Sequence, residues 1–234
     1  MIEVTKNDVR YLALACDYDG TLATHGVVDE ATLDALDRLR LSGRKLILVT
    51  GRELGELQLV FPHLDRFERV VAENGALLYR PATGEEVLLA EPPPAEFIAA
   101  LRERKVRPLS VGRVIVATFE PFHTAARDVI RTLDLELQVV FNKGSVMVLP
   151  FGVDKAVGLK AALAELGLSL HQTVGVGDAE NDEAMLNACR CSAAVANALQ
   201  RTKDCADIVT QGTHGAGVAE LIDRIIATDL QELG

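Results

Sequence analysis

Basic residues are scarce in this sequence relative to acidic ones. Its 234 residues include 24 lysines and arginines against 34 aspartates and glutamates, which gives a formal net charge of −10 at pH 7. A nucleic-acid partner needs a basic protein face to meet its phosphate backbone, so this balance argues against DNA or RNA as a partner. The acidity by itself selects no function, because many metabolic enzymes are acidic for solubility.

Long apolar runs are also lacking. The first residues carry an acid at Glu3 and only a short apolar run before the chain becomes polar again. Such a start predicts neither a secretory signal nor a membrane span, and we expect no membrane partner.

Cysteine is a third scarce residue. The four copies are Cys16, Cys189, Cys191 and Cys205. Cys189 and Cys191 are two positions apart, which is too close for an ordinary disulfide, and no histidine spacing indicates zinc. We therefore expect reduced thiols in a cytoplasmic protein.

Four short apolar runs are present, and each ends in polar residues or glycine. They read YLALACDYDG, KLILVTGR, ERVVAENG and TVGVGD. Continuous runs of this length are typical of parallel strands that are covered on both faces. Leucines recur at helical spacing within 29–43 and 155–169, and each pattern meets a glycine near its end. The alternation predicts an α/β fold with a doubly wound, parallel, Rossmann-like core sheet.

The pattern changes between residues 81 and 151. Helices are expected over 95–105 and 122–133, a strand over 113–119, and two short strands around FNKG. The last two flank Asn142, Lys143 and Gly144 and predict a hairpin. We expect a small inserted α+β domain over 81–151, with a discontinuous core domain formed by 1–80 and 152–234.

Polar residues follow three of the apolar runs. They are Asp17 and Asp19, Thr50 and Gly51, and Asp178, to which the start of a predicted helix adds Lys155. In open α/β sheets ligands bind at the carboxyl ends of the strands, so these side chains are expected at one edge. Carboxylates, a hydroxyl, backbone amides and a lysine suit a hard divalent cation together with a phosphoryl group.

The four motifs DYDGT, VTGR, a separate Lys155 and GDAEND, in this order, resemble those of the haloacid dehalogenase (HAD) superfamily. The position and size of the insertion resemble the type-two-capped, Cof-like (IIB) phosphatase branch, in which it would be a cap domain. The resemblance covers residues 10–80 and 152–227. It implies a phosphoric monoester hydrolase that uses Mg²⁺.

The resemblance assigns roles to the aspartates. Asp17 would be the nucleophile that forms an aspartyl-phosphate, which water then hydrolyses. Asp19 would protonate the leaving oxygen and later take a proton from water. Asp17, the backbone carbonyl of Asp19, and Asp178 would hold Mg²⁺.

The same resemblance assigns the phosphate contacts. The Thr50 hydroxyl, the Gly51 amide and the Lys155 ammonium would hold the phosphoryl oxygens while charge shifts. Asn181 and Asp182 would complete the acidic shell, through a metal-bound water or by orienting Lys155.

Four further residues have two interpretations each. Arg52 either reaches toward the substrate or forms a surface ion pair. Asn74 either borders the site or belongs to a hairpin turn. Asn142 and Lys143 either clamp a substrate anion or form a solvated hairpin tip.

The function we expect is hydrolysis of a small phosphorylated metabolite, such as a sugar phosphate or a phosphoglycolate-like monoester. A phosphohexomutase-type phosphotransferase is the first alternative, because such enzymes also use both aspartates. A non-catalytic phospho-aspartate switch is the second, although a cap has little purpose in a receiver domain. The sequence predicts no oligomeric state.

Overall fold

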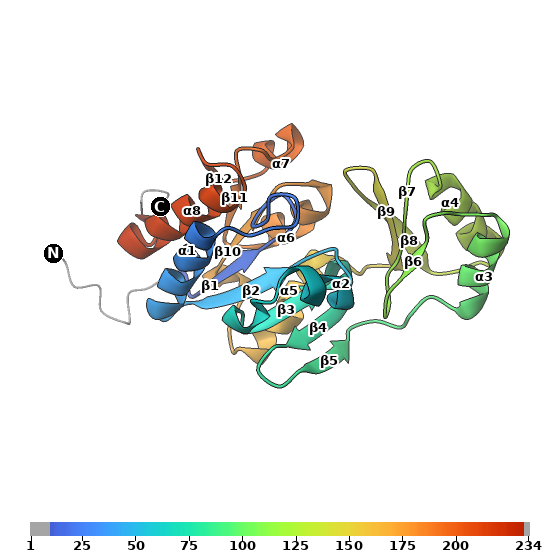
Figure 1. Cartoon of the computed structure of the whole chain (residues 1–234), viewed down its shortest axis with the longest axis horizontal. Helices are drawn as coiled ribbons and strands as arrows, with labels where there is room; N and C mark the ends of the chain where they lie inside the picture. Colours follow the sequence, from blue (N-terminus) through green and yellow to red (C-terminus); the bar gives the residue numbers. More distant parts are fainter. Residues whose placement is uncertain (1–9, 232–234) are drawn as a thin grey trace.

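The computed structural model describes residues 10–231, so the prediction made for the segment around Glu3 lies outside the described residues. The described chain forms a large sheet of eight strands and a small sheet of four. Figure 1 shows each sheet with its own helices, at opposite ends of the long axis of the molecule.

The large sheet is mostly parallel. In spatial order its strands are β12 (Ile208–Val209), β11 (Cys191–Ala194), β10 (Thr173–Gly177), β1 (Ala13–Cys16), β2 (Lys45–Val49), β3 (Arg69–Ala72), β4 (Leu77–Arg80) and β5 (Glu85–Leu88). The strands from β12 to β3 pair in parallel, whereas β4 and β5 add an antiparallel extension. The predicted doubly wound parallel core is confirmed, and the antiparallel extension was not predicted.

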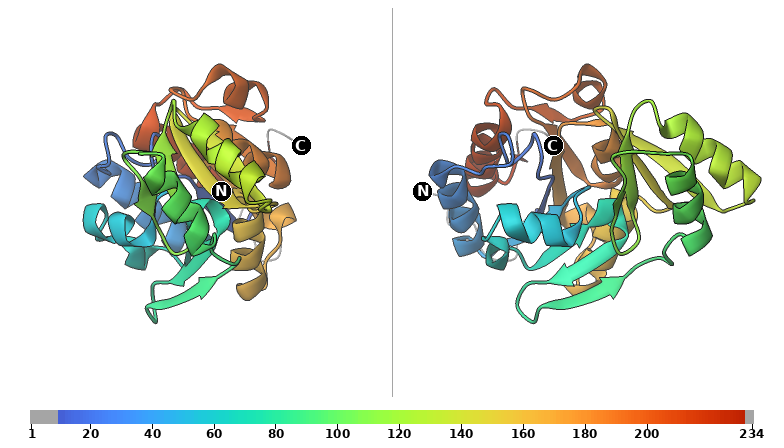
Figure 2. Two further views of the ribbon diagram at one scale, coloured as in Figure 1. Left: turned by 90° about the vertical axis from the view of Figure 1, so that its right-hand side faces the viewer. Right: turned by 45° about the vertical axis from the view of Figure 1, so that its right-hand side comes forward.

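Helices cover both faces of this sheet, as the two views in Figure 2 show. They are α1 (Glu30–Leu41), α2 (Leu54–Val60), α5 (Lys155–Glu165), α6 (Glu183–Ala188), α7 (Gln200–Asp204) and α8 (His214–Thr228). In β2, Leu46 and Leu48 belong to the buried cluster that includes α1 and α8 side chains. Ile47 and Val49 belong to the cluster that includes α5 and α6 side chains. Both faces of the strand are buried, which explains the unbroken apolar run.

The small sheet lies within the predicted insertion. Its elements are α3 (Ala95–Glu103), β6 (Ser110–Val111), β7 (Val116–Phe119), α4 (His123–Thr132), β8 (Leu137–Asn142) and β9 (Ser145–Pro150). One face packs on α3 and α4 through Phe97 and Val129. The small sheet with α3 and α4 forms the small unit, and the large sheet with its helices forms the large unit. The other face of the small sheet places Met147 in a cluster with Ala76 of the large unit. β8 and β9 pair with Asn142 opposite Ser145, which confirms the predicted hairpin.

Short 3-10 turns lie in the connections between the elements of the large sheet and its helices. They are η1 (Leu64–Arg66), η2 (Glu73–Gly75), η3 (Leu170–Gln172) and η4 (Glu180–Asp182). In η2, Gly75 has a φ of +106°, and a Cβ at this position would lie 1.9 Å from the carbonyl oxygen of Asp154. A Cβ on Gly158 would lie 2.7 Å from the Cα of Gly75. Glycine at both positions allows the turn after β3 to contact the first turn of α5.

Two expectations from composition can be compared with the structure. All four cysteines are free thiols, and Cys16 and Cys191 are buried. No helix among residues 10–231 has both the length and the apolar character that crossing a membrane requires.

A buried ion pair joins the residue before β2 to the end of α8. Arg44 Nη2 lies 2.9 Å from Asp229 Oδ1, and the two side chains are 8% and 6% exposed. Arg44 also donates to the carbonyl oxygens of Tyr11 and Ile225. Breaking a buried pair leaves an uncompensated charge, which costs more free energy than the pair contributes.

Arg44→Met is expected to lower the free energy of unfolding by about 3 kcal/mol or more, because the Asp229 carboxylate stays buried without its cation. The matched control is Arg38→Met, whose pair with Asp223 is 48% and 61% exposed. That control is expected to change stability by less than about 1 kcal/mol. Urea unfolding of the three proteins measures both effects. Equal losses in the two variants would contradict this account of the Arg44 pair.

Candidate active site

Asp17 lies at the carboxyl end of β1, in the middle of the large sheet. Its backbone amide donates to the carbonyl oxygen of Val176 in β10 at 3.0 Å. Cys16 is paired with Leu48 of β2, so β1, β2 and β10 end at one edge. The Asp17 side chain is buried at 4% exposure. The backbone of Asp17 is therefore fixed by hydrogen bonding within the sheet.

Lys155 brings a positive charge to this edge. Its Nζ donates to Asp17 Oδ1 at 2.5 Å and to Asp182 Oδ1 at 2.6 Å, and the side chain is fully buried. Burial disfavours the charged ammonium, but Asp17 and Asp182 outweigh this effect and raise the pKa of Lys155. The lysine therefore stays cationic where a phosphoryl group would need a positive charge.

The position of Lys155 follows from its local sequence. It is the first residue of α5, and Asp154 caps the helix by accepting a hydrogen bond from the amide of Val157 at 2.9 Å. An aspartate before the first turn is a standard helix start. The cap and the close packing of α5 on the turn after β3 fix where the lysine side chain begins.

Asp182 orders the loop that follows β10. Its Oδ2 accepts hydrogen bonds from the amides of Asp178 and Ala179 at 2.9 and 3.0 Å. Its other oxygen accepts from Lys155. Both oxygens of this buried carboxylate are thus engaged, one by the loop and one by the lysine. Through this contact Asp182 can orient Lys155, which is one of the two roles predicted for it.

Asp178 approaches the loop after β1 closely. Thr21 Oγ1 donates to Asp178 Oδ1 at 3.3 Å, and a Cβ on Gly20 would lie 2.2 Å from Asp178 Oδ2. Gly20 has a φ of +84°, so the position requires glycine for both space and conformation. The glycine of the DYDGT motif thereby brings Asp178 close to the loop that follows Asp17.

Burial dominates the acidity of both carboxyl groups. It raises the pKa of Asp17 to about 8, with Asp182 adding to the rise and Lys155 opposing it. Burial also raises the pKa of Asp178, and the ion pair with Lys143 opposes that rise. Carboxylates held this close together favour a cation between them.

Three carboxylates are close enough together to hold one ion. Asp17, Asp178 and Asp182 each offer an oxygen, and these oxygens all lie within 4.8 Å of one another. An all-oxygen donor set suits a hard cation such as Mg²⁺. Asp19, which the sequence placed in the metal site through its backbone carbonyl, has its carboxylate elsewhere.

Asp19 and Arg52 form a bidentate ion pair. Arg52 Nε and Nη2 donate to the two oxygens of Asp19 at 2.6 and 2.7 Å. The hydrogen bonds to Asp19 raise the pKa of Arg52, and its guanidinium lies over the Tyr18 ring at 5.6 Å. Arg52 also lines the cavity described below. It is therefore both an ion-pair partner and a residue within reach of a bound molecule.

Thr50 and Gly51 follow β2 at the same edge as Asp17. Thr50 is buried, and its Oγ1 accepts a hydrogen bond from the amide of Arg52 at 3.1 Å. Gly51 lines the cavity, and a Cβ there would meet the sulfur of Met147 at 3.4 Å. The sheet thus brings the TGR segment beside the acids, as the sequence predicts for parallel neighbours.

Asn74 belongs to a turn, as one of its two interpretations predicts. It lies in the turn between the antiparallel strands β3 and β4, with a φ of 55°. Its Oδ1 accepts a hydrogen bond from Asn181 Nδ2 at 3.0 Å, and both side chains are buried. Asn181 belongs to η4, next to Asp182. The turn after β3 is therefore connected to the acidic loop.

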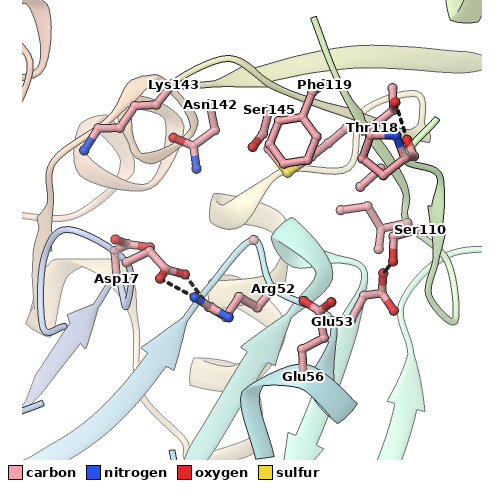
Figure 3. A pocket seen from close by; sticks show the side chains of 16 residues that line it. Asp17, Arg52, Glu53, Glu56, Ser110, Thr118, Phe119, Asn142, Lys143 and Ser145 are labelled. Atoms are coloured by element: carbon pink, nitrogen blue, oxygen red, sulfur yellow. Dashed lines mark hydrogen bonds and ion pairs between the residues drawn. The ribbon is translucent and has the colours of Figure 1, made fainter. Parts of the chain in front are cut away.

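A cavity of about 440 Å³ opens above these groups, between the two sheets. Its lining includes Asp17, Asp19, Gly51, Arg52, Glu53, Glu56, Ser110, Thr118, Phe119, Asn142, Lys143, Ser145 and Met147. Figure 3 shows Asn142, Lys143 and Ser145 across the cavity from Asp17, Arg52 and Glu53. The hairpin tip thus faces the acids, and Lys143 forms an ion pair with Asp178.

Several residues of the cavity wall had no signal in the sequence. Glu53 accepts a hydrogen bond from Ser110 across the two units, and burial raises the pKa of Glu53. Thr118 and Phe119 come from β7. Glu53 directly follows TGR, which offers a weak hint, but nothing in the sequence relates it to Ser110.

Comparison with known proteins gives one family and several relatives. A family model described as haloacid dehalogenase-like hydrolase matches residues 14–107 and 114–222. The chain is 30% identical over 224 residues to Phosphoglycolate phosphatase 2 of Saccharolobus solfataricus, covering 92% of this chain and 93% of that protein.

Solved structures share the fold. A HAD/COF-like hydrolase from Plasmodium vivax has a TM-score of 0.79 at 22% identity, covering 95% of this chain and 97% of that one. A HAD subclass IIB sugar phosphatase has a TM-score of 0.75 at 19% identity, covering 91% and 98%. At these identities the likeness establishes the architecture, including the small inserted sheet.

The pKa shift of Asp17 predicts how stability depends on pH. The folded protein keeps the Asp17 proton up to about pH 8, whereas the unfolded chain loses it near the ordinary value of 3.8. Within this window the native state binds more protons than the unfolded state, so Asp17 lowers stability as pH rises. Asp17→Asn cannot titrate and is free of this loss.

In metal-free buffer with EDTA, the free energy of unfolding of Asp17→Asn is expected to increase relative to that of the parent as the pH rises from 5 to 8. Urea unfolding at both pH values measures the difference. The opposite outcome is a difference in the free energy of unfolding that is the same at pH 5 and pH 8, or that shifts in favour of the parent at pH 8. It would show that Asp17 is not protonated in the folded state.

Proposed function

This chain belongs to the haloacid dehalogenase-like hydrolases and is a phosphatase of small phosphorylated metabolites, and from that premise we propose its mechanism, cofactor and substrate class. It hydrolyses a phosphomonoester with Mg²⁺ through an aspartyl-phosphate on Asp17. The observation that carries the proposal is the buried contact of Asp17 with Lys155 at the floor of the cavity. It supplies a nucleophile and a fixed positive charge at one point.

Asp17, which lines the cavity, attacks phosphorus through a carboxylate oxygen. The P–O bond to the leaving group breaks as the new P–O bond to Asp17 forms, and water later cleaves the acyl-phosphate. Lys155, held by Asp182, stabilises the negative charge on the phosphoryl oxygens. The Thr50 hydroxyl and the Gly51 amide bind the remaining oxygens. This set positions the phosphoryl group without any rearrangement of the sheet edge.

Asp19 acts as the general acid and then as the base. A protonated Asp19 donates to the leaving oxygen, and the resulting carboxylate takes a proton from the attacking water. Both oxygens of Asp19 accept hydrogen bonds from Arg52, at 2.6 and 2.7 Å. At least one of these contacts must open before an Asp19 oxygen can carry the proton and donate it to the leaving group.

The acidic cluster fits Mg²⁺ by donor type. Asp17, Asp178 and the backbone carbonyl of Asp19 would hold the ion, since both oxygens of Asp182 are already engaged. A bound Mg²⁺ would neutralise charge between the phosphate dianion and the attacking carboxylate. Lys143 pairs with Asp178 and lines the same cavity.

The small sheet supports a cap domain over the phosphate site. β5 pairs with β4 in the large sheet, so we place the start of the cap after Leu88 rather than at residue 81. Its end stays at 151, after β9. The cavity of about 440 Å³ accepts a small metabolite. Relatives named phosphoglycolate phosphatases support phosphoglycolate as the first substrate to test, with sugar phosphates next.

Phosphate release from phosphoglycolate and a panel of sugar phosphates tests the reaction. The parent is expected to turn over at least one of them, and Asp17→Asn to lose activity by several orders of magnitude because the nucleophile is gone. Asp34→Asn, an exposed carboxylate on α1, is the matched control and keeps full activity. Substantial activity in Asp17→Asn would remove the proposed nucleophile. Transfer of phosphate to a second sugar hydroxyl, without release, would favour the mutase.

Calorimetry with Mg²⁺ tests the metal site independently of turnover. The parent is expected to bind the ion, and Asp178→Asn to weaken binding by about tenfold or more, because one charged ligand is lost. Asp204→Asn, exposed on α7, is expected to bind like the parent. Unchanged affinity in Asp178→Asn would place the metal site elsewhere.

A further inference from the structure

Glu73 is a buried carboxylate that the proposed chemistry does not use. It begins the η2 turn after β3, is 1% exposed, and has a φ of 51°. Its Oε1 accepts a hydrogen bond from the amide of Arg113 at 2.8 Å. Its Oε2 accepts from the amides of Val114 and Ile115 at 2.7 and 2.8 Å. The side chain thus reaches from the large unit to the backbone of the small one.

Three successive amides around one carboxylate form an anion-binding loop. A buried charge is costly unless it is paired or strongly hydrogen-bonded. Charge-assisted bonds from backbone amides meet that need, and consecutive amides in a turn are a recurrent anion site. Here the protein's own side chain fills the site. The contact is therefore specific for a carboxylate at position 73.

The fit leaves little room between the two units. A Cβ on Gly112 would lie 2.7 Å from Glu73 Oε1 and 2.8 Å from Ile115 Cγ2. The carboxylate cannot move aside without breaking its three hydrogen bonds. Glycine at 112 is thus required for the loop to close around Glu73.

The backbone of the same turn forms hydrogen bonds with the TGR segment, which is the proposed phosphate-binding loop. The amide of Glu73 donates to the carbonyl of Arg52, and the amide of Asn74 donates to the carbonyl of Thr50, both at 2.9 Å. Asn74 also accepts from Asn181 in the acidic loop. The backbone of the turn therefore holds the TGR segment, while the Glu73 side chain holds the small unit.

The loop that Glu73 holds leads directly into the cavity wall. Ile115 lines the cavity, as do Ser110 before the loop and Ala117 after it. A displacement of residues 112–115 would move this wall relative to Arg52 and Asp17. Displacements on the order of 1 Å are enough to cost about a hundredfold in rate when they misplace a substrate.

We infer, on the basis of the proposed phosphatase function, that Glu73 is a positioning residue that sets the distance between the cap wall and the phosphate-binding loop. It governs how the leaving group of the substrate is bound, and it leaves the binding of the phosphoryl group unchanged. The reason is that the hydrogen bonds of its side chain go to the small unit, whereas the phosphate contacts depend on the backbone of the turn.

Glu73→Gln tests this role with little change in size. One amide of the 113–115 loop would face the glutamine NH2 group instead of an acceptor. The loop is therefore expected to move away from residue 73. We expect KM for phosphoglycolate, or for the best substrate of the panel, to rise about tenfold or more. The inhibition constant of inorganic phosphate is expected to stay within about twofold, since the proposed phosphate contacts of Lys155, Thr50 and Gly51 all belong to the large unit.

Two further variants distinguish a displacement of the 112–115 loop from a general loss of the fold. Gly112→Ala leaves Glu73 intact and pushes the loop away from it, so it is expected to reproduce the rise in KM. Glu86→Gln removes the partly exposed partner of Arg113 in the same loop and is expected to behave like the parent. Thermal unfolding of each variant shows whether the fold is retained.

A rise in KM with an unchanged phosphate inhibition constant, in both Glu73→Gln and Gly112→Ala, supports the inference. Parent-like KM values in both variants would overturn it, as would a KM and a phosphate inhibition constant that rise together. Either of these results leaves the proposed function standing when the parent releases phosphate. Absence of release by the parent on every substrate of the panel would instead count against the proposed function itself.

Discussion

The contact of one buried ammonium with two buried carboxylates determines the architecture of the active site. Lys155, Asp17 and Asp182 come from three separate segments, and the buried Lys155 ammonium is stable in the protein interior only because the two acidic groups accept its hydrogen bonds. Their pairing requires that β1, the loop after β10, and the start of α5 converge at one edge of the sheet. The glycines at 20, 75 and 158 are consequences of this convergence, because each stands where two segments approach closely.

Much of the large unit could be predicted because its signals are local. Four apolar runs gave four strands, since strands buried on both faces are apolar throughout. Asp17, Asp178 and Lys155 were expected together because parallel strands end at a common edge. The antiparallel strands β4 and β5 were missed, because β4 is a short stretch directly after a turn, and β5 is mostly exposed and carries two glutamates, a pattern that also suits a surface loop.

Contacts between the two units could not be predicted, because no periodicity relates residues so distant in the chain. Glu73 reads as an ordinary turn residue beside Asn-Gly, and its three partners are backbone amides, which leave no trace in the sequence. The bond between Glu53 and Ser110 is equally invisible. For Arg52 and Asn74 the sequence offered two interpretations each, and the structure shows the ion pair of Arg52 with Asp19 and the turn that contains Asn74. Motifs thus reveal the chemistry of the large unit, while the wall that selects the leaving group depends on tertiary packing.

The order of strands in the large sheet also affects how the protein is made. β1 pairs with β10, so Ala13 lies beside Thr173, and Lys155 is 138 positions from Asp17. During synthesis the ribosome releases β1 long before β10, its partner on one side, so that side of β1 stays unpaired until the whole insertion has been made. Such distant pairing is typical of slow folding, and the waiting strand exposes apolar edges to aggregation. The acidic surface of the chain and the early completion of β2 and β3 beside β1 would protect the nascent protein during this interval.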